Sequence, residues 1–88
     1  MKRVQVCVKN GYDRSKYYDV IIDNKQTKQD AVNIIKRNLK ALYISPLAFI
    51  TATSIQPVDQ FGKYKPGTIL DGDWNSYCFG EVLIEGGE

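Results

Sequence analysis

Two stretches near the start of the chain alternate between apolar and polar residues, which is the pattern of a strand with one buried face. They span residues 2–9 and 16–23, and Asn10-Gly11 between them is a turn signal. We therefore predict a β-hairpin. Its apolar face comprises Val4, Val6, Val8, Tyr18, Val20 and Ile22, and its opposite face comprises Arg3, Gln5, Cys7, Lys9, Tyr17, Asp19, Ile21 and Asp23.

Apolar residues at helical spacing follow in residues 27–42 and predict one amphipathic helix. Thr27 suits the N-cap position, and Asp30 three residues later is an acidic variant of the capping box. Ser45-Pro46 should stop the helix by Tyr43 or Ile44, because the residue before proline disfavours helical backbone. The predicted core-facing stripe is Ala31, Ile35, Leu39 and Leu42, widened by Val32 and Ile34.

The second half of the chain is less regular. Residues 47–55 are rich in β-branched residues and apolar on both faces at their start, which favours a strand in the centre of the sheet. Residues 56–75 are irregular, and a short strand over residues 68–70 is an optional addition. Residues 76–84 predict a final strand.

The predicted element order is therefore β-β-α-β-(β)-β in a single domain over residues 1–88. One amphipathic helix on one face of a mainly antiparallel sheet of four to five strands is the simplest arrangement, so we expect a two-layer α+β fold. The other face of the sheet should be partly exposed or used for contacts.

Composition argues against most catalytic and metal-binding sites. The chain has no histidine, which removes the commonest general base and a common metal ligand. It also has no CxxC pair, no phosphate-binding glycine loop and no GxSxG motif. We expect a protein that is not an enzyme and that has no cofactor and no metal site.

One segment matches part of a calcium loop. Asp71, Asp73 and Asn75 occupy the first three ligand positions, but Ser76 and Val82 stand where the loop requires glycine and glutamate. A polar turn is the preferred interpretation of this segment.

Targeting signals are absent from the sequence as it stands. No apolar run is long enough to span a membrane, and the alternating N-terminus lacks a signal-peptide core. We expect a cytoplasmic protein with no membrane partner, in which Cys7 and Cys78 are reduced. A disulfide between them is the alternative, and it requires the terminal strands to be neighbours.

Charge is distributed unevenly along a chain whose net charge is +2. Residues 1–44 have ten Lys or Arg and four Asp, a balance of +6, whereas residues 45–88 have two Lys and six Asp or Glu, a balance of −4. Such asymmetry bears on the choice of partner rather than on the fold. Because folding can interleave the two halves, a mixed surface is the simpler expectation.

Two predicted loops and the polar face of the helix combine basic and aromatic residues. Cations neutralise phosphates and aromatic rings stack on bases, so a small nucleic-acid-binding domain would use this mixture. Tyr, Trp and Arg are also enriched at protein interfaces, and a long irregular segment in a small domain is usually functional or disordered. The simpler alternatives are that the cations lie on a solvated face and that the aromatic rings cover the core. The candidate interaction residues are Tyr12, Arg14, Lys16, Lys36, Arg37, Lys40, Phe61, Lys63, Tyr64, Lys65 and Trp74.

In its size, its single-domain α+β pattern and its lack of catalytic residues, the chain resembles the small accessory proteins of phages and mobile elements, including the anti-CRISPR inhibitors. The resemblance covers the overall pattern and no residue motif. It implies a phage-encoded protein of the host cytoplasm that occupies a surface on a host protein or nucleoprotein complex. Many such inhibitors are acidic mimics of nucleic acid, whereas this chain has a net charge of +2.

Three functional hypotheses are open at this point. The first is a non-enzymatic protein-binding module that inhibits a host defence nucleoprotein complex. The second is a small nucleic-acid-binding domain that uses its basic and aromatic loops. The third is a homodimeric structural protein paired through its sheet edges.

Overall fold

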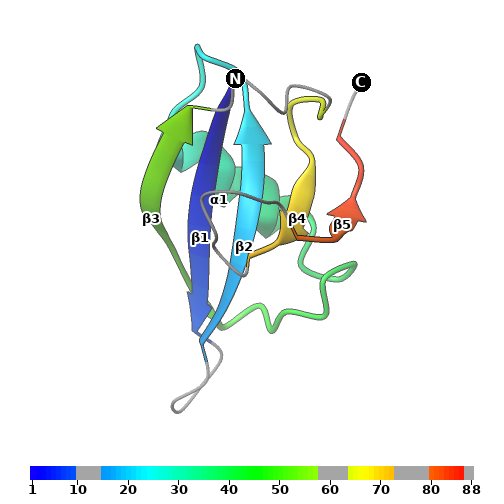
Figure 1. Cartoon of the computed structure of the whole chain (residues 1–88). Coiled ribbons are helices and arrows are strands. Elements are labelled where there is room, and N and C mark those ends of the chain that lie inside the picture. The colour runs from blue at the N-terminus through cyan, green and yellow to red at the C-terminus, as the bar shows by residue number, and fades with distance from the viewer. Residues whose placement is uncertain (10–14, 58–63, 73–79, 87–88) are drawn as a thin grey trace.

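The computed structural model describes residues 1–9, 15–57, 64–72 and 80–86, and these ranges contain one helix and five strands. The elements follow the predicted β-β-α-β-β-β order, with the optional strand present (Figure 1). In chain order they are β1 (Lys2–Lys9), β2 (Ser15–Ile22), α1 (Lys28–Arg37), β3 (Phe49–Pro57), β4 (Ile69–Asp71) and β5 (Val82–Ile84).

All five strands pair antiparallel in one sheet of order β3-β1-β2-β4-β5, and α1 lies across one face of it (Figure 1). The predicted two-layer α+β fold is confirmed. The β1–β2 hairpin has the predicted alternation, since Val4 lies opposite Val20 and Val6 lies opposite Tyr18. These side chains form the face that α1 covers.

The position of β3 corrects the sequence analysis. We expected residues 47–55 to form a central strand, but β3 lies at the edge of the sheet and pairs only with β1 among the described strands. Because β1 pairs with β2 in the hairpin and β2 pairs with β4, the free side of β1 is the place that remains for β3. The apolar residues of β3 are divided between partial cover for the core, as at Ile50, and solvent, as at Phe49.

The main core lies between α1 and the sheet. Ala31, Ile34 and Ile35 of α1 pack against the apolar face of the hairpin and against Ile69 of β4. Burial of this kind is the principal source of stability in a domain of this size. The remaining buried members of the cluster are Val4, Val6, Val8, Tyr18, Val20, Ile22, Leu42 and Ile44.

The helix begins as predicted and ends early. The carboxylate of Asp30 accepts a hydrogen bond from the backbone N–H of Thr27 at 2.7 Å, the reciprocal half of a capping box. The predicted end at Leu42 is wrong, because α1 ends at Arg37. Asn38 follows it, and its side-chain amide donates to the carbonyl of Ile34 at 2.7 Å. Among the described residues, no helix is long and apolar enough to cross a membrane.

The last two strands differ from their predicted bounds. β4 is displaced by one residue from the predicted 68–70, and β5 contains only three residues of the predicted 76–84. Residues 76–79 lie outside the described ranges, and residues 80 and 81 are not in a strand. Of the three candidate calcium ligands Asp71, Asp73 and Asn75, only Asp71, at the end of β4, lies within the described residues.

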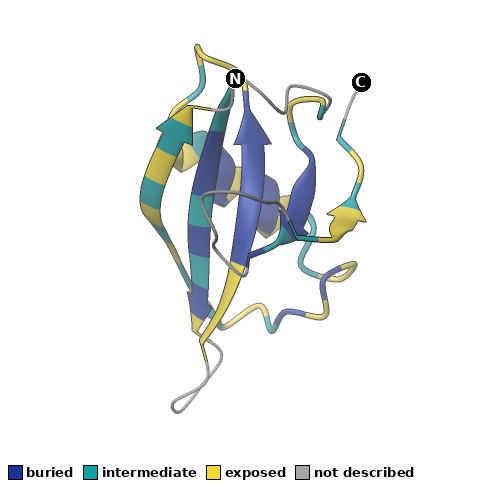
Figure 2. Cartoon of the chain, viewed as in Figure 1, coloured by how far each residue is buried: buried dark blue, intermediate teal, exposed yellow. Residues whose placement is uncertain are grey.

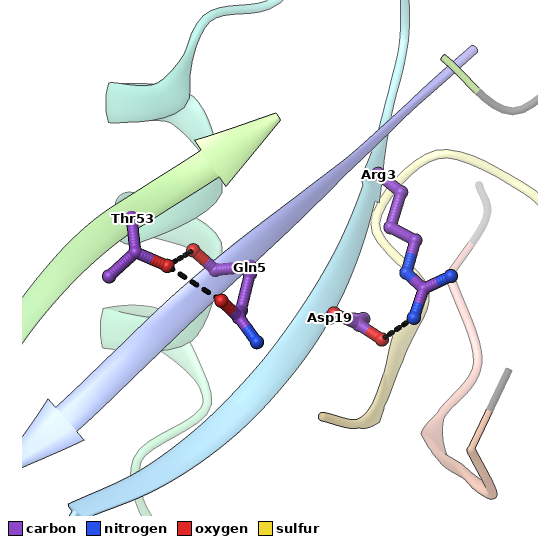
Figure 3. Close-up of polar contacts among 4 residues, drawn as sticks. All are labelled: Arg3, Gln5, Asp19 and Thr53. Atoms are coloured by element: carbon purple, nitrogen blue, oxygen red, sulfur yellow. Dashed lines mark hydrogen bonds and ion pairs between the residues drawn. The ribbon is translucent and has the colours of Figure 1, made fainter. Parts of the chain in front are cut away.

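The second face of the sheet is buried where β2 and β4 meet, as the dark colouring of these strands shows in Figure 2. We expected this face to be partly exposed or used for contacts. It is exposed at Tyr17 and Thr51, whereas Ile21 and Leu70 are fully buried there beside Met1 and Tyr64. Arg3 and Asp19 are also buried on this face. Their side chains form an ion pair at 2.9 Å (Figure 3). Alternation had placed these residues on the correct face but could not show that the face was covered.

Candidate interaction surface

Three large apolar side chains protrude into solvent around the connection between α1 and β3. Tyr43 is 95% exposed, Leu47 is 90% exposed and Phe49 is 78% exposed. Each of the other exposed large apolar side chains on the described chain keeps about half or more of its surface covered. We call Tyr43, Leu47 and Phe49 the connector surface.

The backbone explains how Tyr43 is turned outward. The N–H of Ile44 donates to the carbonyl of Leu39 at 2.9 Å and the N–H of Tyr43 donates to that of Lys40 at 3.2 Å. These two bonds form a Schellman motif, whose last residue but one has left-handed backbone and is usually glycine. Tyr43 occupies this position with φ of 58°, while Leu42 and Ile44 on either side are buried.

A tyrosine at this position has an energetic disadvantage that its side chain does not offset. Left-handed backbone costs a residue with a Cβ about 1–2 kcal/mol. At 95% exposure, the Tyr43 ring contributes almost no burial in return. A strained residue that contributes nothing to the core is a reason to look for a binding role.

We expect Tyr43→Gly to stabilise the isolated protein by about 0.5–1 kcal/mol, because glycine adopts φ of 58° without strain and little packing is lost. Tyr43→Ala is the matched control, since it removes the ring but keeps the Cβ, and it should leave stability nearly unchanged. Urea unfolding of the three chains measures both effects. A loss of more than about 1 kcal/mol in either variant would show that the ring has a packing role.

Leu47 and Phe49 follow a turn that begins at Ser45. The hydroxyl of Ser45 accepts from the N–H of Leu47 at 3.1 Å, and its carbonyl accepts from the N–H of Ala48 at 3.1 Å. Ala48 and Ile50 then pack against the core. Leu47 and Phe49, which alternate with them along the chain, point away from it. Phe49 lies opposite Lys9 at the hairpin end of the sheet.

Along the whole length of β3, the outer edge pairs with no strand among the described residues. Its side chains alternate between partly covered and exposed, which gives the two-colour pattern of β3 in Figure 2. The pairing with β1 shifts register between Gln5 and Val6, so Thr53 is the extra residue of a bulge. The Thr53 hydroxyl is 3.1 Å from the backbone carbonyl of Gln5 and 2.9 Å from its side-chain oxygen (Figure 3).

The connector and β3 differ from the rest of the chain in charge. Residues 41–58 contain no charged residue, although one residue in four of the whole chain is charged. The described part of this segment therefore combines exposed apolar side chains with an unpaired strand edge and no ionic group. Depletion of charge and enrichment in aromatic residues are the features that distinguish the cores of protein interfaces.

Those of the residues singled out from the sequence that the structure describes are not members of the connector surface. Lys36 and Arg37 are exposed in the last turn of α1, where cations complement the helix dipole, and Lys40 is exposed in the turn that follows. Lys16 is exposed at the start of β2, with its ammonium 5.5 Å from the ring centre of Tyr18.

Tyr64 packs against Ile21 and Leu70, so its role is at least partly structural. Lys65 beside it is exposed, and both line an open hollow of about 290 Å³ next to β5. The hollow also contains Glu85, so its charges are mixed. The predictions for five further residues fall outside the described ranges: Tyr12, Arg14, Phe61, Lys63 and Trp74.

Sequence reasoning did not select the connector surface. The sequence places Tyr43 only near the end of the predicted helix and Phe49 in a predicted central strand. The available signal is the charge-free segment 41–58. Aromatic residues within that segment are a better indication of an exposed contact site than aromatic residues mixed with lysines.

Tyr18 is a titratable group of the described residues whose pKa its environment alters. Burial raises the pKa of its hydroxyl above the ordinary 10.0, and the negative charge of Asp71, opposite it on β4, raises it further. The folded state therefore holds this proton more tightly than the unfolded state. Stability from this difference is complete below pH 10.0 and is lost as pH rises from there through the folded-state pKa.

We expect unfolding free energy to fall above pH 10.0 in the parent chain and to fall less steeply in Tyr18→Phe. Urea titrations at pH 8 to 11 measure the slope, and Tyr43→Phe controls for loss of an exposed tyrosine hydroxyl. Equal alkaline slopes in the parent chain and Tyr18→Phe would contradict the assignment.

Metal-ligating side chains are not gathered together. Within the described residues, no group of three or more Cys, Asp or Glu side chains could hold a metal ion. Cys7 has a free thiol and is half-buried on β1, while Cys78 lies outside the described ranges.

Comparisons with protein families, with curated proteins and with solved structures found no match to this chain.

Proposed function

We propose that this protein is a small non-enzymatic protein-binding module that contacts its partner through the connector surface. The observation that carries the proposal is Tyr43, an aromatic residue held in left-handed backbone with its ring 95% exposed. Leu47 and Phe49 supply further apolar area on the same connection. Binding hot spots are typically a few aromatic or apolar anchors of this kind.

We further propose, from the resemblance in overall pattern, that the partner belongs to a host defence nucleoprotein complex and that the protein acts as a phage-type inhibitor. A protein of this size would inhibit by occupying a surface in a stoichiometric complex. The absence of charge from residues 41–58 argues for a protein surface, rather than a phosphate backbone, as the group contacted by the connector.

The proposal is tested by affinity capture from host lysate with the immobilised protein, with and without nuclease. We expect the captured protein to survive nuclease treatment and to fall by at least about tenfold with the triple variant Tyr43→Gly, Leu47→Ser, Phe49→Thr. The matched control changes exposed apolar residues of β5, Val82→Thr and Leu83→Ser, and should capture normally. Equal capture by the folded triple variant and the parent chain would end the proposal.

Nucleic-acid binding is the second candidate, and the cations at the end of α1 favour it. Lys36, Arg37 and Lys40 are exposed close together in sequence, and within the described part of the chain none of them forms an ion pair. Binding of a labelled oligonucleotide through these groups would weaken steeply with added salt. Their joint replacement by glutamine should abolish it, and no binding by the parent chain at low salt would remove this candidate.

A further inference from the structure

We propose that β3 pairs antiparallel with β3 of a second copy of this chain, so that two sheets join in a closed homodimer. The proposal concerns the backbone edge of β3 and goes beyond the connector surface. The edge is open because β3 pairs with β1 on one side and with no described strand on the other. Open edges of this length are the sites at which sheets join.

Only part of β3 is suited to such pairing. The bulge at Thr53 interrupts its second half, and Pro57 at the end has no N–H to donate. Both are recognised means of protecting an edge. Residues 49–52 have regular pairing with β1 and neither protection, so the contact should centre on them.

The opposite edge of the sheet is better protected. β5 has only three residues, and the exposed Glu81 and Glu85 flank it directly. Short edge strands and flanking charges both discourage pairing. Pairing of β3 with β5 of another copy, which would build an open filament, is therefore disfavoured relative to a closed pair of β3 strands.

A second copy fits this edge in charge. β3 and the connector before it contain no ionic group, so two copies meet there without like-charge repulsion and without removing a charge from water. A partner strand with Lys, Glu or Asp would have to remove the hydration of these charged side chains to pair with the β3 edge. The low net charge of +2 also adds little repulsion between the two copies.

The geometry of the dimer follows from the register. Antiparallel joining of two identical edges requires a two-fold axis normal to the sheet, which places both α1 helices on the same face. In two registers, Ile50 lies opposite Ile50 of the second copy or Thr51 lies opposite Thr51. Each of these registers pairs every side chain with one on the same face of the joined sheet. In either register the two Thr51 side chains lie directly opposite or diagonally adjacent, close enough for introduced charges to interact.

The test is the mass in solution by light scattering and sedimentation, from about 1 µM to about 500 µM, for the parent chain and edge variants. We expect the parent mass to rise from 10.0 kDa to twice that value over this range. Thr51→Lys and Thr51→Glu should each remain monomeric at concentrations where the parent is dimeric. An equimolar mixture of the two should recover the dimer through charge pairing. Leu83→Lys on the β5 edge is the matched control and should dimerise as the parent does.

A parent chain that stays at 10.0 kDa throughout would overturn the proposal, as would Thr51→Lys and Thr51→Glu chains that dimerise as well as the parent. Circular dichroism confirms that each variant is folded before its mass is compared. All edge variants retain Tyr43, Leu47 and Phe49. Failure of self-pairing therefore leaves the capture test of the connector surface unaffected, and the two proposals can fail separately.

Discussion

Asp19→Asn should destabilise the protein by about 3–5 kcal/mol, the largest effect we expect from any single polar substitution. The side chains of Arg3 and Asp19 are 3% and 0% exposed, and they form an ion pair at 2.9 Å. The substitution removes the negative charge that faces the buried Arg3 guanidinium, and breaking a buried ion pair from one side is strongly destabilising. Urea unfolding of the parent chain and the variant measures the loss.

Two further variants distinguish the loss of the ion pair from the general effect of substituting an aspartate. Asp23→Asn changes the exposed aspartate that follows β2 and should alter stability by less than about 0.5 kcal/mol. The double variant Arg3→Met, Asp19→Leu should recover most of the loss, because an apolar pair avoids burying either charge. A loss below about 1 kcal/mol in Asp19→Asn would show that water or another group compensates the Arg3 charge.

Ile21→Ala should cost about 2–5 kcal/mol, the range for removing a large aliphatic side chain from a packed core. Ile21 is 0% exposed on the face of the sheet opposite α1, where it packs with Leu70. The substitution removes buried methyl groups and leaves a cavity that the surrounding strands cannot fully close. It therefore tests whether the sheet has a true core on both faces.

Ile55→Ala is the matched control for Ile21→Ala, because it makes the same chemical change in a strand at a side chain that is 37% exposed. We expect it to cost about 1 kcal/mol or less. Similar losses for the two variants in urea unfolding would mean that the second face is not packed as the structure describes.

The central hairpin and the start of the helix could be predicted because their causes are local. Alternation of Val4, Val6 and Val8 defines a buried face whatever the neighbouring strand is. The capping contact of Asp30 with Thr27 spans only three residues. These features require no knowledge of how distant segments meet.

The edge position of β3 and the buried ion pair could not be predicted in the same way. Alternation shows which residues share a face of a strand but not which strand lies beside it. Arg3 and Asp19 were placed on one face of the hairpin, but their burial depends on cover that is distant in sequence. Tyr43 was also beyond prediction, because left-handed backbone at a Schellman position is expected of glycine.

The kind of function that we propose follows from the sequence, but the location of the candidate site does not. The proposal of a binding protein starts from the lack of histidine and of the catalytic motifs considered, and that argument needs only the sequence. The residues chosen for contact were exposed cations and loop aromatics, whereas the structure draws attention to Tyr43, Leu47 and Phe49 through their exposure. Exposure of an apolar side chain is a tertiary property, so sequence patterns alone do not reveal it.

Amide hydrogen exchange in the connector surface and β3 tests the account most directly. Amide exchange would be compared in three samples: the dilute protein, the concentrated protein and the captured complex. We predict added protection within residues 43–57 in at least one of the last two samples, with β5 exchanging at the same rate in all three. The central claim is that the protein makes its contacts through the connector surface and β3. Unchanged exchange across residues 43–57 in both the concentrated protein and the captured complex, together with new protection in α1 or β5, would contradict that claim.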